Sequence, residues 1–336
     1  MRKILALLMT AAMLLSMAAC GTTPAPETTA GSQGAEQTEG TAAQEKFVIG
    51  ICQLVPHDAL DAATKGFMDR IIEELGEENV EFLVELGGGD TATCAPIVND
   101  FVAKEVDLIL ANATPALQAA AAATDEIPIL GTSVTEYGVA LEIKDFNGVV
   151  GGNISGTSDL APLDQQAAMV KEWFPDAKNV GLLYCSAESN SKYQVETVEA
   201  ELTKLGYTCK MFAFADSNDL AAVTQSAADE SDVIYIPTDN TAASAVETID
   251  AICLEAKVPV IAGEEGICKG AGVATLSISY YDLGIATGAM AVEILREGAD
   301  IATMEIGYAE ATKKYDAERC EELGLTVPEG YAAIEK

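Results

Sequence analysis

The sequence predicts an α/β protein made of two lobes, each built around a doubly wound parallel sheet. Apolar runs of strand length alternate with longer amphipathic segments along most of the chain, and this alternation restarts after Asn153. The strand-length runs are apolar throughout, which is typical of parallel strands that helices cover on both faces. About 290 residues follow this pattern, more than one hydrophobic core usually serves, so two lobes are expected.

The first series of elements begins at Phe47 with a continuous apolar strand. Gly76 ends the helix that follows, a glycine-rich turn at 87–90 leads into the next helix, and Pro115 suits the first turn of a third. We therefore expect strands at 47–52, 80–85, 107–111 and 128–130, with helices at 60–75, 91–104 and after Pro115.

The second series repeats the same order of strands and crossover helices. Apolar runs such as 180–184 and 233–236 are each followed by a segment whose apolar residues have helical spacing. The expected helices are 162–173, 189–205, 218–229, 241–256 and 281–296, and the expected strands are 180–184, 208–214, 233–236, 259–262, 273–278 and 304–309.

The N-terminus resembles a bacterial lipoprotein signal. Arg2 and Lys3 precede a short apolar stretch, and small residues then lead directly to Cys20. In such a signal, residues 1–19 are removed and Cys20 becomes the lipidated first residue, so we expect a protein held to the extracytoplasmic face of a bacterial cell membrane. An ordinary cleaved signal with an incidental Cys20 is the alternative. Residues 20–46 contain no large apolar side chain and are expected to form a disordered tether.

The composition excludes several classes of partner and cofactor. The net charge is −34, with 53 acidic and 19 basic residues, so neither nucleic acid nor an anionic membrane surface is an expected partner. The eight cysteines include no C-x-x-C pair, and the single histidine, His57, rules out a metal cluster of several histidines, so no metal and no cofactor is expected. The cysteines after Cys20 are expected to be mostly reduced and structural.

The segments directly after the expected strands are small and polar, and they hold the candidate binding residues. The carboxyl ends of parallel strands form the ligand crevice of doubly wound sheets. Thr114 and Ser191 stand where helices start, and helix N-termini suit a carboxylate or a phosphate. Taken singly, each such residue is as well explained as a helix cap or a turn residue. The candidates are Gln53, His57, Thr114, Ser133, Tyr184, Glu188, Asn190, Ser191, Asp239, Asn240 and Glu264.

Signatures of catalysis are scarce in the sequence. It contains no nucleophile elbow, no phosphate-binding loop and no dinucleotide-binding fingerprint. His57 follows a strand at a proline turn and is expected to contact a ligand or cap a helix rather than catalyse. Asp239 with Glu188 or Glu264 could form an acid pair, but a carboxylate in a polar cleft fits the ammonium group of a zwitterion equally well. We therefore expect no catalytic residue and no enzyme.

Several short motifs, in their order along the chain, resemble one known family. They are IGICQ at 49–53, HDALD at 57–61, GF at 66–67, ATPA at 113–116, NISGTSD at 153–159, ESNS at 188–191, PTDNT at 237–241, AGEEG at 262–266 and YYDLG at 280–284. Together they resemble the tryptophan/tyrosine-type substrate-binding lipoproteins of ABC transporters, which have the type I periplasmic binding-protein fold. The expected lipoprotein signal agrees with this resemblance.

The resemblance implies two lobes joined by a three-strand hinge, with a ligand captured between them. Lobe 1 would combine 47–152 with 270–296, and lobe 2 would combine 153–269 with 297–336. The protein would be a monomer that binds an amino acid, aromatic by analogy with the family (tryptophan, tyrosine or phenylalanine). It would then deliver this ligand to the permease subunits of an importer in the membrane.

The resemblance also implies how the candidates would divide the work of binding. The carboxylate of the ligand would meet Thr114 and Ser133, and its ammonium group would meet Asp239 or Glu188, because a buried zwitterion needs every charge paired. The other polar candidates would complete the hydrogen bonds. Three side chains could form an apolar wall for an aromatic ligand, those of His57, Tyr184 and Tyr280.

Two other functions remain open at this point. A nucleoside- or sugar-binding lipoprotein would have the same fold, although few aromatic residues follow the expected strands for stacking on a sugar. A secreted hydrolase would have to use His57.

Overall fold

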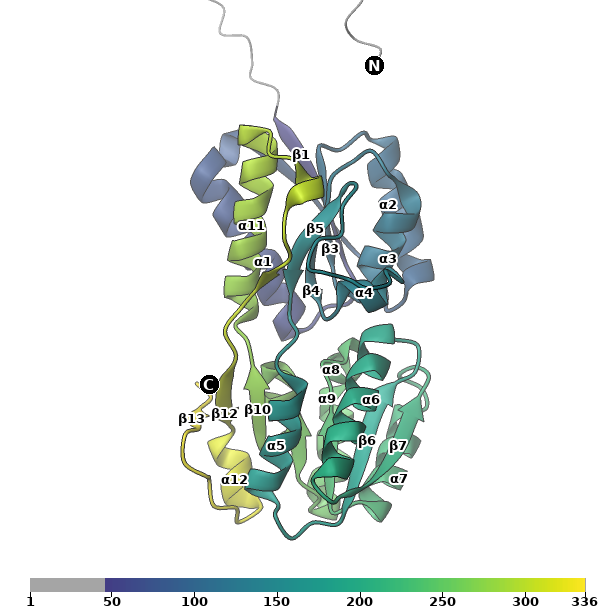
Figure 1. Cartoon of the computed structure of the whole chain (residues 1–336), viewed down its shortest axis with the longest axis vertical. Helices are drawn as coiled ribbons and strands as arrows, with labels where there is room; N and C mark the ends of the chain where they lie inside the picture. The colour runs from purple at the N-terminus through teal and green to yellow at the C-terminus, as the bar shows by residue number, and fades with distance from the viewer. Residues whose placement is uncertain (1–45, 336) are drawn as a thin grey trace, which may run out of the picture. The chain divides into compact units, whose positions relative to one another are not determined.

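The computed structural model describes residues 46–335, whose strands form two sheets, one in each lobe (Figure 1). All but one of the strand pairs are parallel, and hydrophobic cores lie on both faces of each sheet, which confirms the predicted fold class. The predicted signal peptide 1–19, the predicted lipidation site Cys20 and, except for Lys46, the predicted tether 20–46 lie outside the described residues. None of the helices within 46–335 is both long and apolar enough to cross a membrane.

The first sheet, in lobe 1, has the strand order β11-β5-β4-β3-β1-β2, and every pair in it is parallel. Its strands are β1 (Phe47–Gln53), β2 (Val80–Leu86), β3 (Leu108–Asn112), β4 (Ile129–Val134), β5 (Ile154–Ser158) and β11 (Gly307–Tyr308). Its helices are α1 (Asp58–Leu75), η1 (Glu77–Asn79), α2 (Thr91–Ala103), α3 (Thr114–Ala123), α4 (Tyr137–Ala140), α11 (Tyr280–Glu297) and η2 (Ile301–Thr303). Helices α1 and α11 cover one face, packing on Ile49 and Ile51, and α2 and α3 cover the other, packing on Cys52 (Figure 1).

Helices α1 and α11 pack closely because glycines of each face the backbone of the other. A Cβ atom at Gly66 would overlap the carbonyl oxygen of Tyr281, and one at Gly284 would overlap the carbonyl oxygen of Ala63. Only glycine allows backbones to approach so closely. The contact fixes α11, which comes late in the chain, onto the first lobe.

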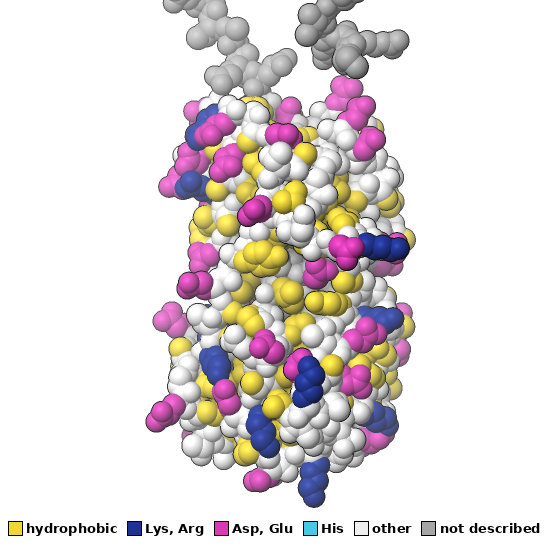
Figure 2. Space-filling model, in the orientation of Figure 1, with side chains coloured by type: hydrophobic (Ala, Val, Ile, Leu, Met, Phe, Trp, Pro, Cys, Tyr) yellow, Lys and Arg dark blue, Asp and Glu magenta, His cyan; other side chains and the backbone are white. Residues whose placement is uncertain are grey.

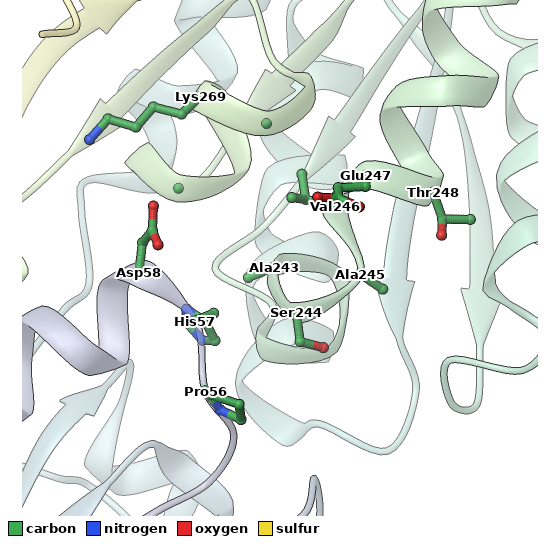
Figure 3. A pocket seen from close by; sticks show the side chains of 12 residues that line it. Pro56, His57, Asp58, Ala243, Ser244, Ala245, Val246, Glu247, Thr248 and Lys269 are labelled. Carbon is green, nitrogen blue, oxygen red and sulfur yellow. The ribbon is translucent and has the colours of Figure 1, made fainter. Parts of the chain in front are cut away.

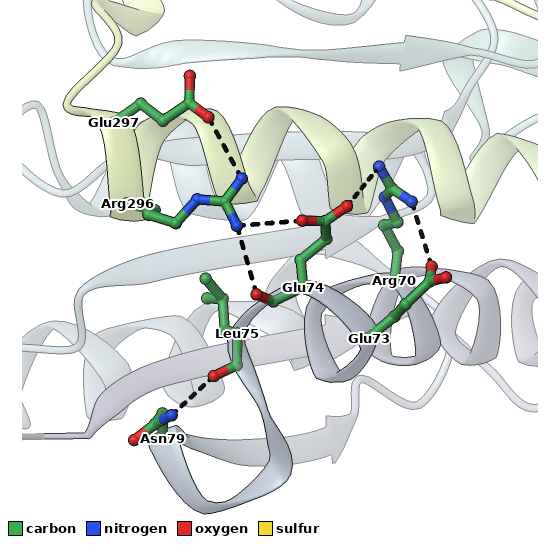
Figure 4. Close-up of polar contacts among 7 residues, drawn as sticks. All are labelled: Arg70, Glu73, Glu74, Leu75, Asn79, Arg296 and Glu297. Carbon is green, nitrogen blue, oxygen red and sulfur yellow. Dashed lines mark hydrogen bonds and ion pairs between the residues drawn. The ribbon is translucent and has the colours of Figure 1, made fainter.

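A small network of ion pairs joins the C-terminal ends of the same two helices (Figure 4). Glu74 of α1 pairs with Arg70 at 2.9 Å and with Arg296 of α11 at 3.0 Å. Glu73 and Glu297 are further partners of these arginines, at 3.1 and 3.3 Å. Because the side chains are exposed to solvent, these pairs contribute little to stability. The glycine contacts therefore decide the packing of the two helices.

The second sheet, in lobe 2, has the strand order β13-β12-β10-β9-β8-β6-β7. Its strands are β6 (Asn179–Cys185), β7 (Thr208–Phe214), β8 (Val233–Ile236), β9 (Val260–Ala262), β10 (Ala274–Ser277), β12 (Thr312–Tyr315) and β13 (Ala332–Ala333), of which β12 runs antiparallel to β10. Its helices are α5 (Leu163–Trp173), α6 (Ser189–Lys204), α7 (Leu220–Glu230), α8 (Asn240–Ser244), α9 (Val246–Ala256), α10 (Glu265–Ala271) and α12 (Ala317–Glu322).

Three crossovers join the lobes, and the pairing of three strands differs from the predicted lobe limits. The pairing of β5 with β4 puts 154–158 in the first sheet, and that of β10 with β9 puts 274–277 in the second. The pairing of β11 with β5 puts 307–308 in the first sheet. The predicted limits are wrong for these strands. The reason for β5 is that its sequence, ISGTS, is small and polar, unlike a typical buried strand. Its side chains are nevertheless buried, and the hydroxyl of Thr157 forms a hydrogen bond of 2.7 Å with that of Thr287.

On the face of the molecule shown in Figure 2, the acidic excess is spread out. Figure 2 shows acidic side chains scattered over both lobes on the face in view, with fewer basic side chains among them. Hydrophobic side chains gather at the level where the crossovers run. Within the described range, the seven cysteines form no disulfide, and six of them are buried.

Candidate functional site

Most of the candidate binding residues lie at the carboxyl ends of the two sheets, where loops of both lobes meet. His57, just before α1, has its Nε2 atom 3.3 Å from Oδ1 of Asn240 in α8. A second hydrogen bond between the lobes joins Gln118 of α3 to Ser189 of α6, at 3.4 Å. Residues of both lobes therefore meet at the carboxyl ends of the parallel strands, which is where ligands bind in such sheets.

Glu188 is buried and holds the start of α8. Its Oε2 atom accepts hydrogen bonds from the backbone and side-chain nitrogens of Asn240 at 3.1 and 2.6 Å. Its Oε1 atom accepts from the backbone nitrogen and hydroxyl of Thr241 at 2.9 and 2.8 Å. Asn190 adds a fifth donor to Oε2 at 3.2 Å. A carboxylate offers about four lone-pair positions, so this one is already saturated.

Asp239 and Glu264 both cap short helices. Asp239 accepts from the backbone nitrogens of Ala242 at 2.8 Å and Cys185 at 2.6 Å, one on each oxygen. Glu264 accepts from the backbone nitrogens of Gly266 and Ile267, again one on each oxygen. Burial raises the pKa of both carboxyl groups to about 7, because the ionised form loses its contact with water. That Asp239 or Glu188 binds an ammonium group stays a prediction, but neither has an oxygen without a partner.

Asp159 was not among the predicted site residues. It follows β5 at the first crossover, is 4% exposed, and accepts a hydrogen bond on Oδ2 from the hydroxyl of Tyr280 at 2.9 Å. Its Oδ1 atom makes no hydrogen bond, although the hydroxyl of Thr135 is near enough to lower the pKa of the carboxyl group. Burial outweighs both hydroxyls and raises the pKa of Asp159 to about 6. The same strand-end rule would have found this residue if ISGTS had been assigned to a strand.

Thr114 and Ser133 present buried hydroxyl groups that make no hydrogen bond. Ala113, at the start of α3, has a φ angle of 94°, and Ser133, in β4, has a φ angle of 53°. Positive φ angles strain residues other than glycine, and such strain is concentrated at ligand sites. Asn190, at the start of α6, also has a buried oxygen without a partner. Since an unpaired buried polar atom costs about 1–3 kcal/mol, these atoms point to a polar ligand as the missing partner.

Gln53 is fully engaged within lobe 1. Its amide nitrogen donates to the carbonyl oxygen of Val55 at 3.0 Å and to Asp61 at 2.6 Å, and its amide oxygen accepts from Thr64 at 2.6 Å. These bonds connect the end of β1 to α1. Gln53 therefore positions the loop that carries His57.

The structure does not bring Tyr184 together with the other candidates. Its ring packs on the core of lobe 2, and the carboxylates that affect it are those of Glu196 and Glu199, about two turns into α6. Ser191 does lie with the others: it is buried in the first turn of α6 and accepts a hydrogen bond from Asn190 at 3.4 Å.

An open pocket of about 620 Å³ lies between the start of α1 and helices of lobe 2 (Figure 3). Pro56, His57 and Asp58 line one side, and residues 243–248 with Lys269 line the other. Figure 3 shows Asp58 and Lys269 on facing sides of this pocket. Burial lowers the pKa of His57, against the opposing effects of Asn240 and nearby carboxylates. This rim of the site is therefore polar and carries a neutral imidazole at pH 7.

A second pocket, of about 510 Å³, is bordered by aromatic rings from both lobes. It also includes Thr135 and Ser158, which are close to Asp159 in space or in sequence. It thus offers an apolar surface next to the unpartnered carboxylate oxygen. The rings are those of Tyr137, Phe146, Tyr193 and Tyr308.

In the part of the chain that the structure describes, the buried acids are not paired with positively charged side chains. Within 46–335, none of Asp159, Glu188, Asp239 and Glu264 forms an ion pair with lysine or arginine; those residues pair with other acids, such as Glu265 with Lys314 at 2.5 Å. The same range holds no cluster of three or more histidines, cysteines and acids suited to a metal ion. The polar groups that the candidate site presents at its centre are hydroxyls, amides and carboxylates.

The chain resembles known binding proteins in sequence over nearly all of the described range. The family "ABC transporter substrate binding protein" matches residues 48–331. The tyrosine-binding protein of Clostridioides difficile (strain R20291) is 34% identical over 286 residues, which are 84% of this chain and 82% of that protein.

Two solved structures agree with the sequence match. The ABC domain from Streptococcus pneumonia in complex with L-Trp is 33% identical and has a TM-score of 0.81. The match covers 86% of this chain and 100% of that one. A substrate-binding protein with adhesive properties from Clostridium difficile, in its ligand-free, open form, is 34% identical with a TM-score of 0.65, over 86% of this chain and 99% of that one. These relatives bind solutes and are not enzymes. The chain therefore belongs to the family of ABC transporter substrate-binding proteins, which work outside the cytoplasm with a membrane permease.

Proposed function

We propose that the protein is the substrate-binding lipoprotein of an ABC importer, and that it binds one aromatic amino acid between its lobes as a monomer. One observation carries this proposal: buried hydroxyls at Thr114 and Ser133 and a buried carboxylate oxygen at Asp159 all lack hydrogen-bond partners. A zwitterion supplies acceptors for the hydroxyls and donors for the carboxylate.

The ligand carboxylate is proposed to bind at the start of α3. The hydroxyls of Thr114 and Ser133 donate to it, and the free backbone N–H groups of the first turn of α3 add further donors and the positive end of the helix dipole. The other polar candidates, which include Asn190 and Asn240, complete the hydrogen bonds from lobe 2. The positive end of the helix dipole thus takes the part that a lysine or arginine side chain can play in binding a carboxylate.

The relatives support an aromatic side chain on the ligand. One relative is called a tyrosine-binding protein and another was solved with L-Trp. At nearly equal identity, the chain matches the L-Trp complex better than the open, ligand-free structure, which is expected if its lobes are closed. The pocket bordered by Tyr137, Phe146, Tyr193 and Tyr308 would receive the ring.

A thermal-shift screen of the twenty amino acids, nucleosides and sugars on the purified protein tests the proposal. Binding stabilises the folded form by mass action, by about 2.7 kcal/mol at a ligand concentration of about one hundred times Kd. We expect tryptophan, tyrosine or phenylalanine to raise Tm by several degrees. A shift with a nucleoside or a sugar and none with any amino acid would contradict the proposed ligand class.

The membrane anchor is proposed separately. Cys20 is expected to carry the lipid and residues 20–46 to form the tether between the membrane and the folded lobes. The test is to grow bacteria that express the protein in medium containing radiolabelled palmitate. The label should enter the wild-type protein and be absent from Cys20→Ala, and label retained in the variant would refute the assignment.

A further inference from the structure

Among the described residues, four carboxyl groups are buried at the carboxyl ends of the sheets and form no ion pair with lysine or arginine: Asp159, Glu188, Asp239 and Glu264. Burying a charge is costly unless hydrogen bonds or an opposite charge compensate for it. The hydrogen bonds of each oxygen therefore show where a ligand could still donate to one of these groups.

Three of the four carboxylates have a hydrogen-bond donor from their own lobe on each oxygen. Glu188 accepts five hydrogen bonds, and Asp239 and Glu264 each accept one backbone N–H on each oxygen. Asp159 accepts one hydrogen bond, from Tyr280 on Oδ2, and near its Oδ1 atom lies the hydroxyl of Thr135, which meets no full hydrogen-bond geometry. The carboxylate with the fewest donors is thus the one at the crossover.

We propose that Asp159 binds the amino group of the ligand, so that the site selects compounds that carry a cationic nitrogen. This inference rests on the proposed function and assigns the ammonium group to a residue other than Asp239 or Glu188. Oδ1 of Asp159 receives one N–H of the ammonium group, and the unpartnered hydroxyl of Thr135 beside it accepts a second. Neutral nucleosides and sugars leave this carboxylate buried and unpaired, and are therefore rejected.

The position of Asp159 also connects ligand binding to the hinge. Asp159 begins the first crossover, and Tyr280, which donates to its Oδ2 atom, begins α11 directly after the second. The ionisable groups that face Asp159 are the phenols of Tyr137 in α4 and Tyr280 in α11 and the carboxyl group of Glu264 at the start of α10. None of them brings a positive charge. The ammonium group of the ligand therefore supplies the positive charge that pairs with Asp159 at the hinge.

Calorimetry with L-tryptophan and L-tyrosine, and with the same compounds lacking the amino group, tests the proposal on Asp159→Asn. The amide keeps the shape and the bond from Tyr280, removes the charge, and replaces the acceptor Oδ1 by an NH2 group that cannot accept from an ammonium group. We expect the affinity for the amino acids to fall at least about 30-fold, as for loss of a charge-assisted hydrogen bond. The affinity for 3-(indol-3-yl)propionate should change less than about 3-fold.

A matched variant controls for the replacement of a buried aspartate. Asp316→Asn is the same change at a buried helix cap of α12, whose backbone N–H bonds to Val273 at the start of β10, away from the cleft. It should leave all affinities unchanged. Wild-type affinity for the amino acids in Asp159→Asn, or an equal loss for the compound without the amino group, would overturn the inference.

A second measurement does not depend on the identity of the ligand. In the ligand-free protein at about pH 8, Asp159→Asn should raise Tm, because it removes an incompletely compensated buried charge. A lower Tm would show that the carboxylate is satisfied by the protein itself, and would overturn the inference. A third result is that Asp159→Asn raises Tm while the wild-type protein binds no amino acid. That result would support the role of Asp159 in binding a cation and would refute only the proposed amino-acid ligand.

Discussion

Replacing Glu264 by glutamine is expected to make the ligand-free protein more stable relative to wild type as the pH rises. Glu264 is 2% exposed, and burial raises the pKa of its carboxyl group to about 7, above the usual 4.5. Between these two values the folded protein binds a proton that the unfolded chain has released. Wild-type stability therefore falls with increasing pH through this range, and the amide, which does not titrate, removes that dependence.

The magnitude follows from the two pKa values. A difference of one in pKa corresponds to about 1.4 kcal/mol, so ionising Glu264 in the folded state costs about 3 kcal/mol relative to the unfolded chain. The free energy of unfolding of Glu264→Gln minus that of wild type should grow by about this amount between about pH 4.5 and about pH 8. Below this range the carboxyl group is protonated in both states and contributes no slope.

Urea denaturation of both proteins at several pH values, followed by circular dichroism, measures this difference. Glu265→Gln is the matched control on the adjacent residue. Although partial burial opposes them, the ammonium groups of Lys314 and Lys269 lower the pKa of Glu265. Its contribution to stability is therefore present above the usual pKa and lost as the pH falls, and a partly exposed pair is worth less than about 1 kcal/mol.

The two variants should thus respond to pH in opposite directions. A pH-independent difference between Glu264→Gln and wild type would refute the reasoning, because it would mean that Glu264 titrates alike in the folded and unfolded chain. A difference that shrinks with rising pH would mean that its two backbone hydrogen bonds outweigh its burial.

Three further changes test the packing, the strain and the contact between lobes. Gly66→Ala should lower the free energy of unfolding by about 1–3 kcal/mol, because the new Cβ meets the carbonyl oxygen of Tyr281, and equal urea midpoints would contradict this. Ser133→Gly should leave the ligand-free protein as stable or up to about 1 kcal/mol more stable, since its φ angle is 53°, yet bind the ligand about 10-fold more weakly in calorimetry. His57→Ala should weaken binding about 3- to 10-fold by removing the bond to Asn240 without lowering the Tm of the ligand-free form, and undiminished affinity would contradict this role.

Local patterns predicted the part of the site that depends on strand ends. Thr114, Asn190 and Glu188 each follow an apolar strand in the sequence, Ser133 lies near the end of one, and parallel strands present their carboxyl ends at one edge. Tyr184 also comes at the end of a strand, but the alternation of side chains along β6 turns its ring toward α6. Sequence position thus indicated the edge of the sheet and not the direction of the side chain.

The sequence by itself determined the fold class, the two series of elements and the polar edge, because apolar periodicity is a local property that burial enforces. Only the tertiary structure decided the lobe of β5, β10 and β11, since strand pairing depends on neighbours far along the chain. It alone also separated Asp159 from Glu188, Asp239 and Glu264. All four are acids near strand ends, but the donors that satisfy a buried carboxylate come from other segments, and their number is fixed only when the chain is folded.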